Sequence, residues 1–193
     1  MLLSNPIPAD EYDVIWPVEP NCKMLELGNK KNKKGIYKNY FKSVGIKHIS
    51  IDWNGKDGAI AFDLRNPIKE LKPNGKWHQY FDIVTNIGTS EHVIPQGAIW
   101  TNMLNALKIN GHLISITPCP GCWNWHQENG LYPTPEFYID LAERNNLKII
   151  SINWKKEIPK TNIYTRMQKL SHLDNPTTDE EMLYVNKIQR TVA

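Results

Sequence analysis

The sequence has few cysteines and no long apolar run. It holds three cysteines among 193 residues, an odd number in a chain that is large enough to form a core without disulfides. No stretch approaches the ~18 consecutive apolar residues that span a bilayer. Residues 1–8 also lack the basic and apolar regions of a signal peptide. These absences argue against a disulfide scaffold and a membrane protein, and they predict a cytoplasmic location.

Net charge is also low. The formal charge of +3 is too small to indicate nucleic-acid binding by itself. Six lysines do gather in one short window: Lys30, Lys31, Lys33, Lys34, Lys38 and Lys42. Such a run is usually a solvated face. The chain length and ordinary composition predict a single domain over residues 1–193.

Short apolar runs alternate with amphipathic segments, as in stacked βαβ units. Five strands are expected at residues 22–27, 48–52, 59–64, 81–86 and 112–117, with helices at 35–44, 95–108 and 134–146. Two final strands, 147–154 and 182–190, are joined by a long connection without a helix. That connection favours an antiparallel pair. We predict a Rossmann-like α/β fold: a mostly parallel seven-stranded sheet with helices on both faces and an antiparallel edge strand.

Polar and small residues follow the first four expected strands. They are Glu26, Gly28 and Asn29, then Asp52 and Trp53, then Asp63 and Leu64, and last Asn86, Ile87 and Gly88. In open α/β sheets ligands bind outside the carboxyl ends of the strands. A nucleoside needs a tight glycine turn, a carboxylate for its ribose hydroxyls, a polar group for the adenine amine and an apolar wall. The sequence offers Gly28, Asp52, Asp63 with Leu64, and Ile87 in that order, and so predicts a nucleoside cleft.

Several segments resemble motifs of the class I S-adenosylmethionine-dependent methyltransferases, above all the small-molecule enzymes related to ubiquinone biosynthesis. The matching segments are 24–28 (MLELG), 51–52 (ID), 62–64 (FDL), 81–84 with 90–93 (FDIV, SEHV) and 107–118, which is the most specific. The resemblance implies S-adenosylmethionine as the cofactor, bound by residues of about 20–117. It also implies a substrate-facing loop at about 118–133 and methylation of a small-molecule oxygen or nitrogen.

The first motif departs from the family pattern. The family continues with one or two further glycines, whereas this chain reads Asn29-Lys30-Lys31-Asn32 and has no glycine before Gly35. Asn29 tolerates the left-handed backbone that glycine favours, and the lysines could contact the carboxylate of the methionine moiety. The alternative is a degenerate methyltransferase fold whose lysine-rich loop holds RNA or another anionic partner. A nicotinamide-dependent oxidoreductase would need Gly-x-Gly-x-x-Gly here, which is absent.

Two histidines are candidate catalytic bases, because imidazole titrates near neutral pH. His92 follows the fourth strand, and His126 lies in the substrate-facing loop. The same loop holds Cys119 and Cys122, which with His126 invite a zinc site, but a fourth ligand is missing and no metal is predicted. No Pro-Pro-aromatic or Pro-Cys motif follows the fourth strand, so a nucleic-acid substrate is not expected. Nothing in the sequence indicates an oligomeric state.

Overall fold

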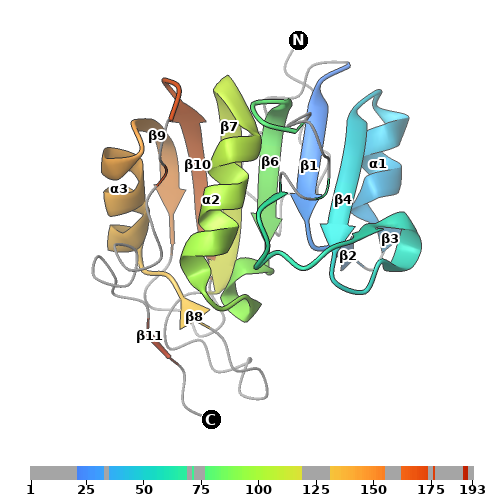
Figure 1. Ribbon diagram of the computed structural model, residues 1–193, viewed down its shortest axis with the longest axis horizontal. Coiled ribbons are helices and arrows are strands. Elements are labelled where there is room, and N and C mark those ends of the chain that lie inside the picture. Colours follow the sequence, from blue (N-terminus) through green and yellow to red (C-terminus); the bar gives the residue numbers. More distant parts are fainter. Residues whose placement is uncertain are drawn as a thin grey trace.

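The computed structural model describes residues 21–32, 35–68, 71, 77–118, 131–154, 162–173, 176 and 189–190. A seven-stranded sheet forms its centre, in the order β5-β4-β1-β6-β7-β10-β9 (Figure 1). The strands are β1 (Lys23–Leu27), β4 (Lys47–Asp52), β5 (Ile60–Ala61), β6 (Phe81–Ile87), β7 (Leu107–Pro118), β9 (Leu147–Asn153) and β10 (Asn162–Lys169). The first five of these run parallel, whereas β10 is antiparallel to both β7 and the edge strand β9. The predicted Rossmann-like fold class is confirmed, with one difference: the antiparallel strand, β10, lies one position in from the edge.

In the described part of the chain, three helices cover the two faces of this sheet. They are α1 (Tyr37–Ser43), α2 (Gln96–Ala106) and α3 (Pro135–Arg144). Trp100 of α2 and Phe137 of α3 belong to one buried cluster, whereas Phe41 of α1 belongs to a second. Neighbouring residues of one strand divide between the two clusters, as Ile83 and Val84 do, because successive side chains of a strand point to opposite faces. The sheet is therefore buried on both sides.

Short elements complete the described residues. A small antiparallel hairpin, β2 (Lys31–Asn32) with β3 (Gly35–Ile36), stands between β1 and α1. Two 3-10 turns follow β4 and β6, at Lys56–Gly58 and Ser90–His92. The pair β8 (Leu131–Tyr132) and β11 (Gln189–Arg190) lies outside the main sheet. None of the helices within the described ranges is long and apolar enough to cross a membrane.

The final strand of the sheet is not the segment that the sequence indicated. We expected residues 182–190, but the strand beside β7 is β10, which lies inside the expected connection. The described end of the expected strand, Gln189–Arg190, pairs with β8 instead. Burial in β10 alternates, with Ile163 and Met167 inside. The buried face of β10 ends in a charged residue, Lys169, whose ammonium donates to Leu104 O (2.8 Å) and Leu107 O (3.0 Å).

Two other boundaries also differ from the prediction. The third strand was expected over 59–64, but β5 spans only Ile60–Ala61. The fifth strand starts earlier than expected, at Leu107, and contains the turn that Asn110 forms at a φ of 64°. The register between β6 and β7 shifts at this point. Thr134 caps α3, its hydroxyl accepting from the backbone N–H of Phe137 (3.4 Å).

Candidate functional site

A cleft of about 780 Å³ opens at the carboxyl ends of β1, β4, β5 and β6. It is lined by Gly28, Asn29, Lys30, Asp52, Trp53, Phe62, Asp63, Leu64, Arg65, Ile87, Gly88, Thr89, His92, Val93 and Ile94. The structure thus brings together almost all of the residues expected to bind the cofactor. Glu26 and Asn86 are the exceptions: both are fully buried and lie behind the lining.

The turn after β1 requires a glycine. Gly28 has a φ of 75°, and its N–H donates to Ile51 O at 2.8 Å. A β-carbon at this position would collide with the side chain of Thr89, whose hydroxyl donates to Leu27 O (2.9 Å). The turn therefore brings the backbone after β1 into close contact with the segment after β6.

A carboxylate and an exposed aromatic ring stand side by side after β4. Asp52 lines the cleft, and its Oδ1 accepts the N–H of Asn54 at 3.0 Å. Trp53 follows and is 82% exposed, the largest exposure among the large apolar residues described. A tryptophan ring left in water at the wall of a cleft offers a stacking surface for a flat ligand. The pair could hold a ribose and an aromatic base.

Asp63 has a partner that the sequence did not indicate. The Arg65 guanidinium donates to both carboxylate oxygens, with its Nε 2.9 Å from each and Nη2 2.5 Å from Oδ2. These bonds hold the pKa of Asp63 below its usual range. Both side chains are exposed at the cleft, while Leu64 beside them is buried. Any ligand amine that bonds Asp63 must therefore share it with Arg65.

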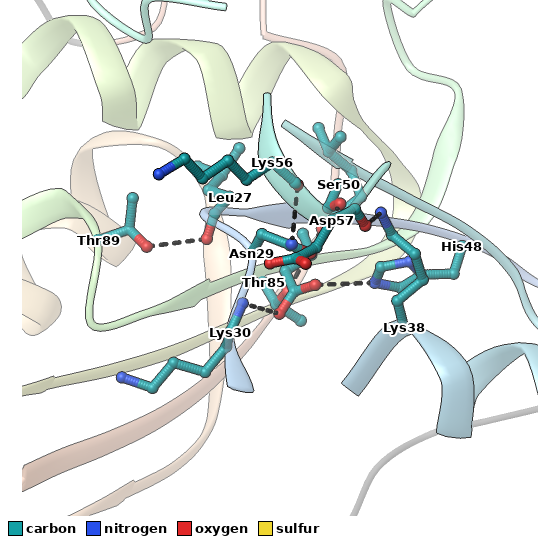
Figure 2. A network of polar contacts seen from close by, with 12 residues as sticks. Leu27, Asn29, Lys30, Lys38, His48, Ser50, Lys56, Asp57, Thr85 and Thr89 are labelled. Atoms are coloured by element: carbon teal, nitrogen blue, oxygen red, sulfur yellow. Dashed lines mark hydrogen bonds and ion pairs between the residues drawn. The ribbon is translucent and has the colours of Figure 1, made fainter. Parts of the chain in front are cut away.

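The loops after β1 and β4 are tied together by polar contacts (Figure 2). The Asn29 amide donates to Lys56 O (3.1 Å) and accepts from the Ser50 hydroxyl (3.2 Å). Lys31 forms an ion pair with Asp57. These contacts fix the loop that carries lysines where the family has glycines.

A buried contact between Glu26 and His48 lies beneath this loop. Glu26 Oε2 is 3.1 Å from His48 Nε2, and both side chains are fully buried. The His48 ring stacks on Phe41 of α1, with the ring centroids 5.4 Å apart. The other oxygen of Glu26 accepts the N–H of Lys30 at 3.3 Å. Glu26 therefore positions the loop from behind, and the described contacts place its carboxylate away from the cleft.

The wall formed by β6 and β7 rests on neutral groups. The Asn86 amide donates to the hydroxyls of Ser90 (2.8 Å) and Ser115 (2.9 Å) and accepts the Ser90 N–H (2.9 Å). Tyr138 of α3 bonds through its hydroxyl to Ser115 (3.1 Å) and Thr117 (2.7 Å). All of these side chains are buried. Asn86 thus holds the end of β6 in shape.

Of the two candidate bases, only one lies in the described part of the chain. His92 lines the cleft and its side chain is 40% exposed, with Nε2 3.9 Å from Glu91 Oε1. His126, Cys119 and Cys122 fall outside the described residues. Within the described ranges no group of three or more histidine, cysteine or acidic side chains could hold a metal ion.

The sequence reading missed several residues of the lining. Arg65, Thr89, Val93 and Ile94 all reach the cleft, yet none was named as a site residue, although Val93 ends the quoted SEHV segment. Their common signal is position, since each follows an expected strand end by eight residues or fewer. A wider window after each strand would have found them.

Solved structures share this fold. The chain has the fold of the class I methyltransferases. Geranyl diphosphate C-methyltransferase from Streptomyces coelicolor A3(2), solved with S-adenosylhomocysteine, superposes with a TM-score of 0.59 at 9% identity, covering 78% of this chain and 74% of that one. The 1,6-didemethyltoxoflavin N1-methyltransferase of Burkholderia thailandensis, also holding S-adenosylhomocysteine, gives 0.55 at 12%, covering 79% and 72%. No family model matches the chain, and no curated protein does either.

The neighbours differ in what they methylate. A third, the 16S rRNA adenine-N1 methyltransferase of Catenulisporales acidiphilia, has a TM-score of 0.53 at 9% identity and covers 80% of this chain and 88% of that one. By their names, the three act on a prenyl diphosphate, a heterocycle and an RNA. The fold alone therefore does not select an acceptor, and the relation to ubiquinone-biosynthesis enzymes remains a prediction.

Proposed function

We propose that the protein is a methyltransferase that uses S-adenosylmethionine to methylate a small-molecule acceptor at oxygen or nitrogen. The observation that carries this proposal is the single cleft wall that joins Gly28, Asp52, Trp53 and Ile87. A tight turn, a carboxylate, an exposed aromatic ring and an apolar side chain are what an adenosine group requires. They stand at the strand ends where α/β sheets bind such ligands.

Each residue has a defined task in this proposal. The Asp52 carboxylate accepts hydrogen bonds from the ribose hydroxyls, and Trp53 and Ile87 enclose the adenine ring. Gly28 lets the backbone after β1 come close to the cofactor. The cofactor supplies an electrophilic methyl group on a positively charged sulfur. The protein has to align the acceptor for in-line displacement and, where the acceptor carries a proton, remove it. His92 is the described side chain best placed to take that proton.

The lysine-rich loop does not favour the alternative of an RNA-binding protein. Lys31 is already paired with Asp57, and Lys38 is buried with its ammonium on Asp57 O (3.0 Å). Both lysines are thus engaged with the turn after β4, and a third, Lys30, lines the cleft. A small acceptor also suits the 1,6-didemethyltoxoflavin complex of one structural neighbour.

Titration calorimetry with S-adenosylmethionine and S-adenosylhomocysteine tests the cofactor. We expect both to bind, and we expect Asp52→Ala to weaken both by at least about a hundredfold, because it removes a charged acceptor of two hydrogen bonds. Asp140→Ala is the matched control: it deletes a carboxylate on α3, outside the cleft lining. No binding to the wild type at millimolar concentration would refute the proposal.

The acceptor class needs its own experiment. The enzyme is incubated with methyl-labelled S-adenosylmethionine and, separately, with the small-molecule, RNA and protein fractions of a cell extract. We expect label in the small-molecule fraction, and less of it with His92→Ala while S-adenosylhomocysteine still binds. Label confined to RNA or protein would overturn the small-molecule assignment and leave the cofactor assignment intact.

A further inference from the structure

The lysines after β1 have different surroundings. Lys31 and Lys38 both end on Asp57, through an ion pair and a bond to its backbone carbonyl. The side chain of Lys30 points away from that turn, as Figure 2 shows. It is also the one described lysine that lines the cleft. Of the described lysines in the run, Lys30 is therefore the one with its charge available at the site.

The backbone of Lys30 is held on both sides. Its N–H donates to Glu26 Oε1 (3.3 Å), and its carbonyl accepts the N–H of Tyr37 (3.2 Å). Glu26 is in turn fixed by the buried pair with His48. Buried groups therefore set the direction from which the Lys30 side chain enters the cleft.

The ammonium of Lys30 ends above Gly88, at the carboxyl end of β6. Its Nζ lies 3.0 Å from the point where a β-carbon on Gly88 would stand, and Glu91 Oε1 lies 3.5 Å from the same point. Gly88 itself is fixed by its N–H bond to Ile116 O (2.9 Å). One positive and one negative group thus face the same small space over the end of β6.

This space suits the amino-acid end of the cofactor. Asp52 and Trp53 occupy the β4 side of the cleft, where the adenosine group is proposed to bind. The rest of the molecule must then extend across β1 toward β6, because β1 lies between β4 and β6 in the sheet. That end carries a carboxylate and an ammonium group, which are the complements of Lys30 and Glu91.

We propose that the Lys30 ammonium binds the carboxylate of the cofactor's amino-acid end, in a chain whose first loop lacks the family's further glycines. The inference rests on the proposed function. It makes Lys30 a residue that selects for the complete cofactor over analogues shortened at that end.

Two ligands separate this role from a general effect on the cleft. S-Adenosylhomocysteine carries the carboxylate, and 5′-methylthioadenosine keeps the adenosine and sulfur but lacks the amino-acid end. We expect Lys30→Gln to weaken S-adenosylhomocysteine about ten- to a hundredfold, the scale of a lost charge-assisted bond. We expect 5′-methylthioadenosine to bind the variant as it binds the wild type.

Lys42→Gln is the matched control, since it removes the same charge from a lysine of α1 that lies outside the cleft lining. It is expected to leave both ligands unchanged, and Lys30→Arg to retain most of the affinity for S-adenosylhomocysteine. Circular dichroism checks that every variant is folded. All titrations use the full chain at one salt concentration, because the contact is electrostatic.

The outcomes are distinct. The inference is wrong if Lys30→Gln weakens the binding of both ligands equally, or of neither. If neither ligand binds more weakly but methyl transfer is slower, Lys30 contacts an anionic acceptor instead. If the wild type binds 5′-methylthioadenosine as tightly as S-adenosylhomocysteine, the inference also fails while the proposed function stands. If the wild type binds neither ligand, the proposed function itself fails.

Discussion

The two halves of the cleft edge are held by different kinds of polar contact. Behind β1 and β4 the contacts involve titratable side chains: Glu26 lies against His48 in the interior, and Lys31 pairs with Asp57 at the surface. Behind β6 and β7 the hydrogen bonds around Asn86 join neutral amides and hydroxyls, and Glu91 is the charged side chain beside them. Charge pairs respond to salt and to the loss of one partner, whereas neutral buried networks respond mainly to lost hydrogen bonds. The half that carries Lys30 is therefore the one expected to be sensitive to electrostatics.

The largest effect is expected for His48→Ala. The substitution leaves the Glu26 carboxylate fully buried without the His48 ring beside it, and removing the partner of a buried charge typically costs about 3–5 kcal/mol. Chemical denaturation measures the loss in the free energy of unfolding. Adding Glu26→Gln to His48→Ala should recover part of the loss, because an amide is cheaper to bury than a carboxylate. No recovery would mean that the lost packing against Phe41 dominates.

A smaller effect is expected in the neutral half, for Tyr138→Phe. The change removes a buried hydroxyl and leaves those of Ser115 and Thr117 short of a partner, at a cost of about 1–2 kcal/mol in unfolding free energy. Burial raises the pKa of Tyr138, so this cost should not vary with salt or with pH near neutrality. Tyr80→Phe, at a half-buried tyrosine outside the network, is the control and should cost less than about 0.5 kcal/mol. If the loss in unfolding free energy depended strongly on salt, the proposed difference between the two halves would be wrong.

Sequence patterns predicted the β1–β4 half better than the β6–β7 half. Gly28 and Asp52 could be placed because strand ends gather at one edge of a parallel sheet. The role of Asn86 could not be found, because its partner Ser115 is 29 residues away, and Tyr138, which bonds Ser115, lies on α3. Hydrogen bonds between distant segments leave no local signal in the sequence.

Two buried charged residues show what the sequence pattern leaves out in the fold and at the site. The ammonium of Lys169, at the end of β10, is satisfied by backbone carbonyls. The carboxylate of Glu26 lies against His48, and its contact with the cofactor stays a prediction. A charged residue is predicted to be exposed unless its partner is known, and the partner is set by tertiary structure.

The surface pair of the charged half should matter little for stability. Asp57→Asn removes the ion pair with Lys31, and exposed pairs contribute at most about 1 kcal/mol. Asparagine also tolerates the φ of 54° at this position, so no backbone strain is added. The cost should shrink further at high salt, as measured by chemical denaturation in parallel salt series. A loss as large as that of His48→Ala would show that the loop, and not the buried pair, holds this half together.

The smallest effect is expected at the outer rim of the charged half, for Arg65→Ala. Arg65 occupies both oxygens of Asp63 and holds the pKa of that carboxyl below its usual range. If Asp63 bonds the adenine amine, freeing it should raise the affinity for S-adenosylhomocysteine at most a few-fold, because the contact is exposed. On acidification, the variant should lose affinity for S-adenosylhomocysteine at a higher pH than the wild type does. Without Arg65 the pKa of Asp63 is no longer lowered, so its carboxylate protonates at a higher pH. Adding Asp63→Ala should remove the gain, and a fall in affinity with Arg65→Ala alone would assign Arg65 itself to the ligand.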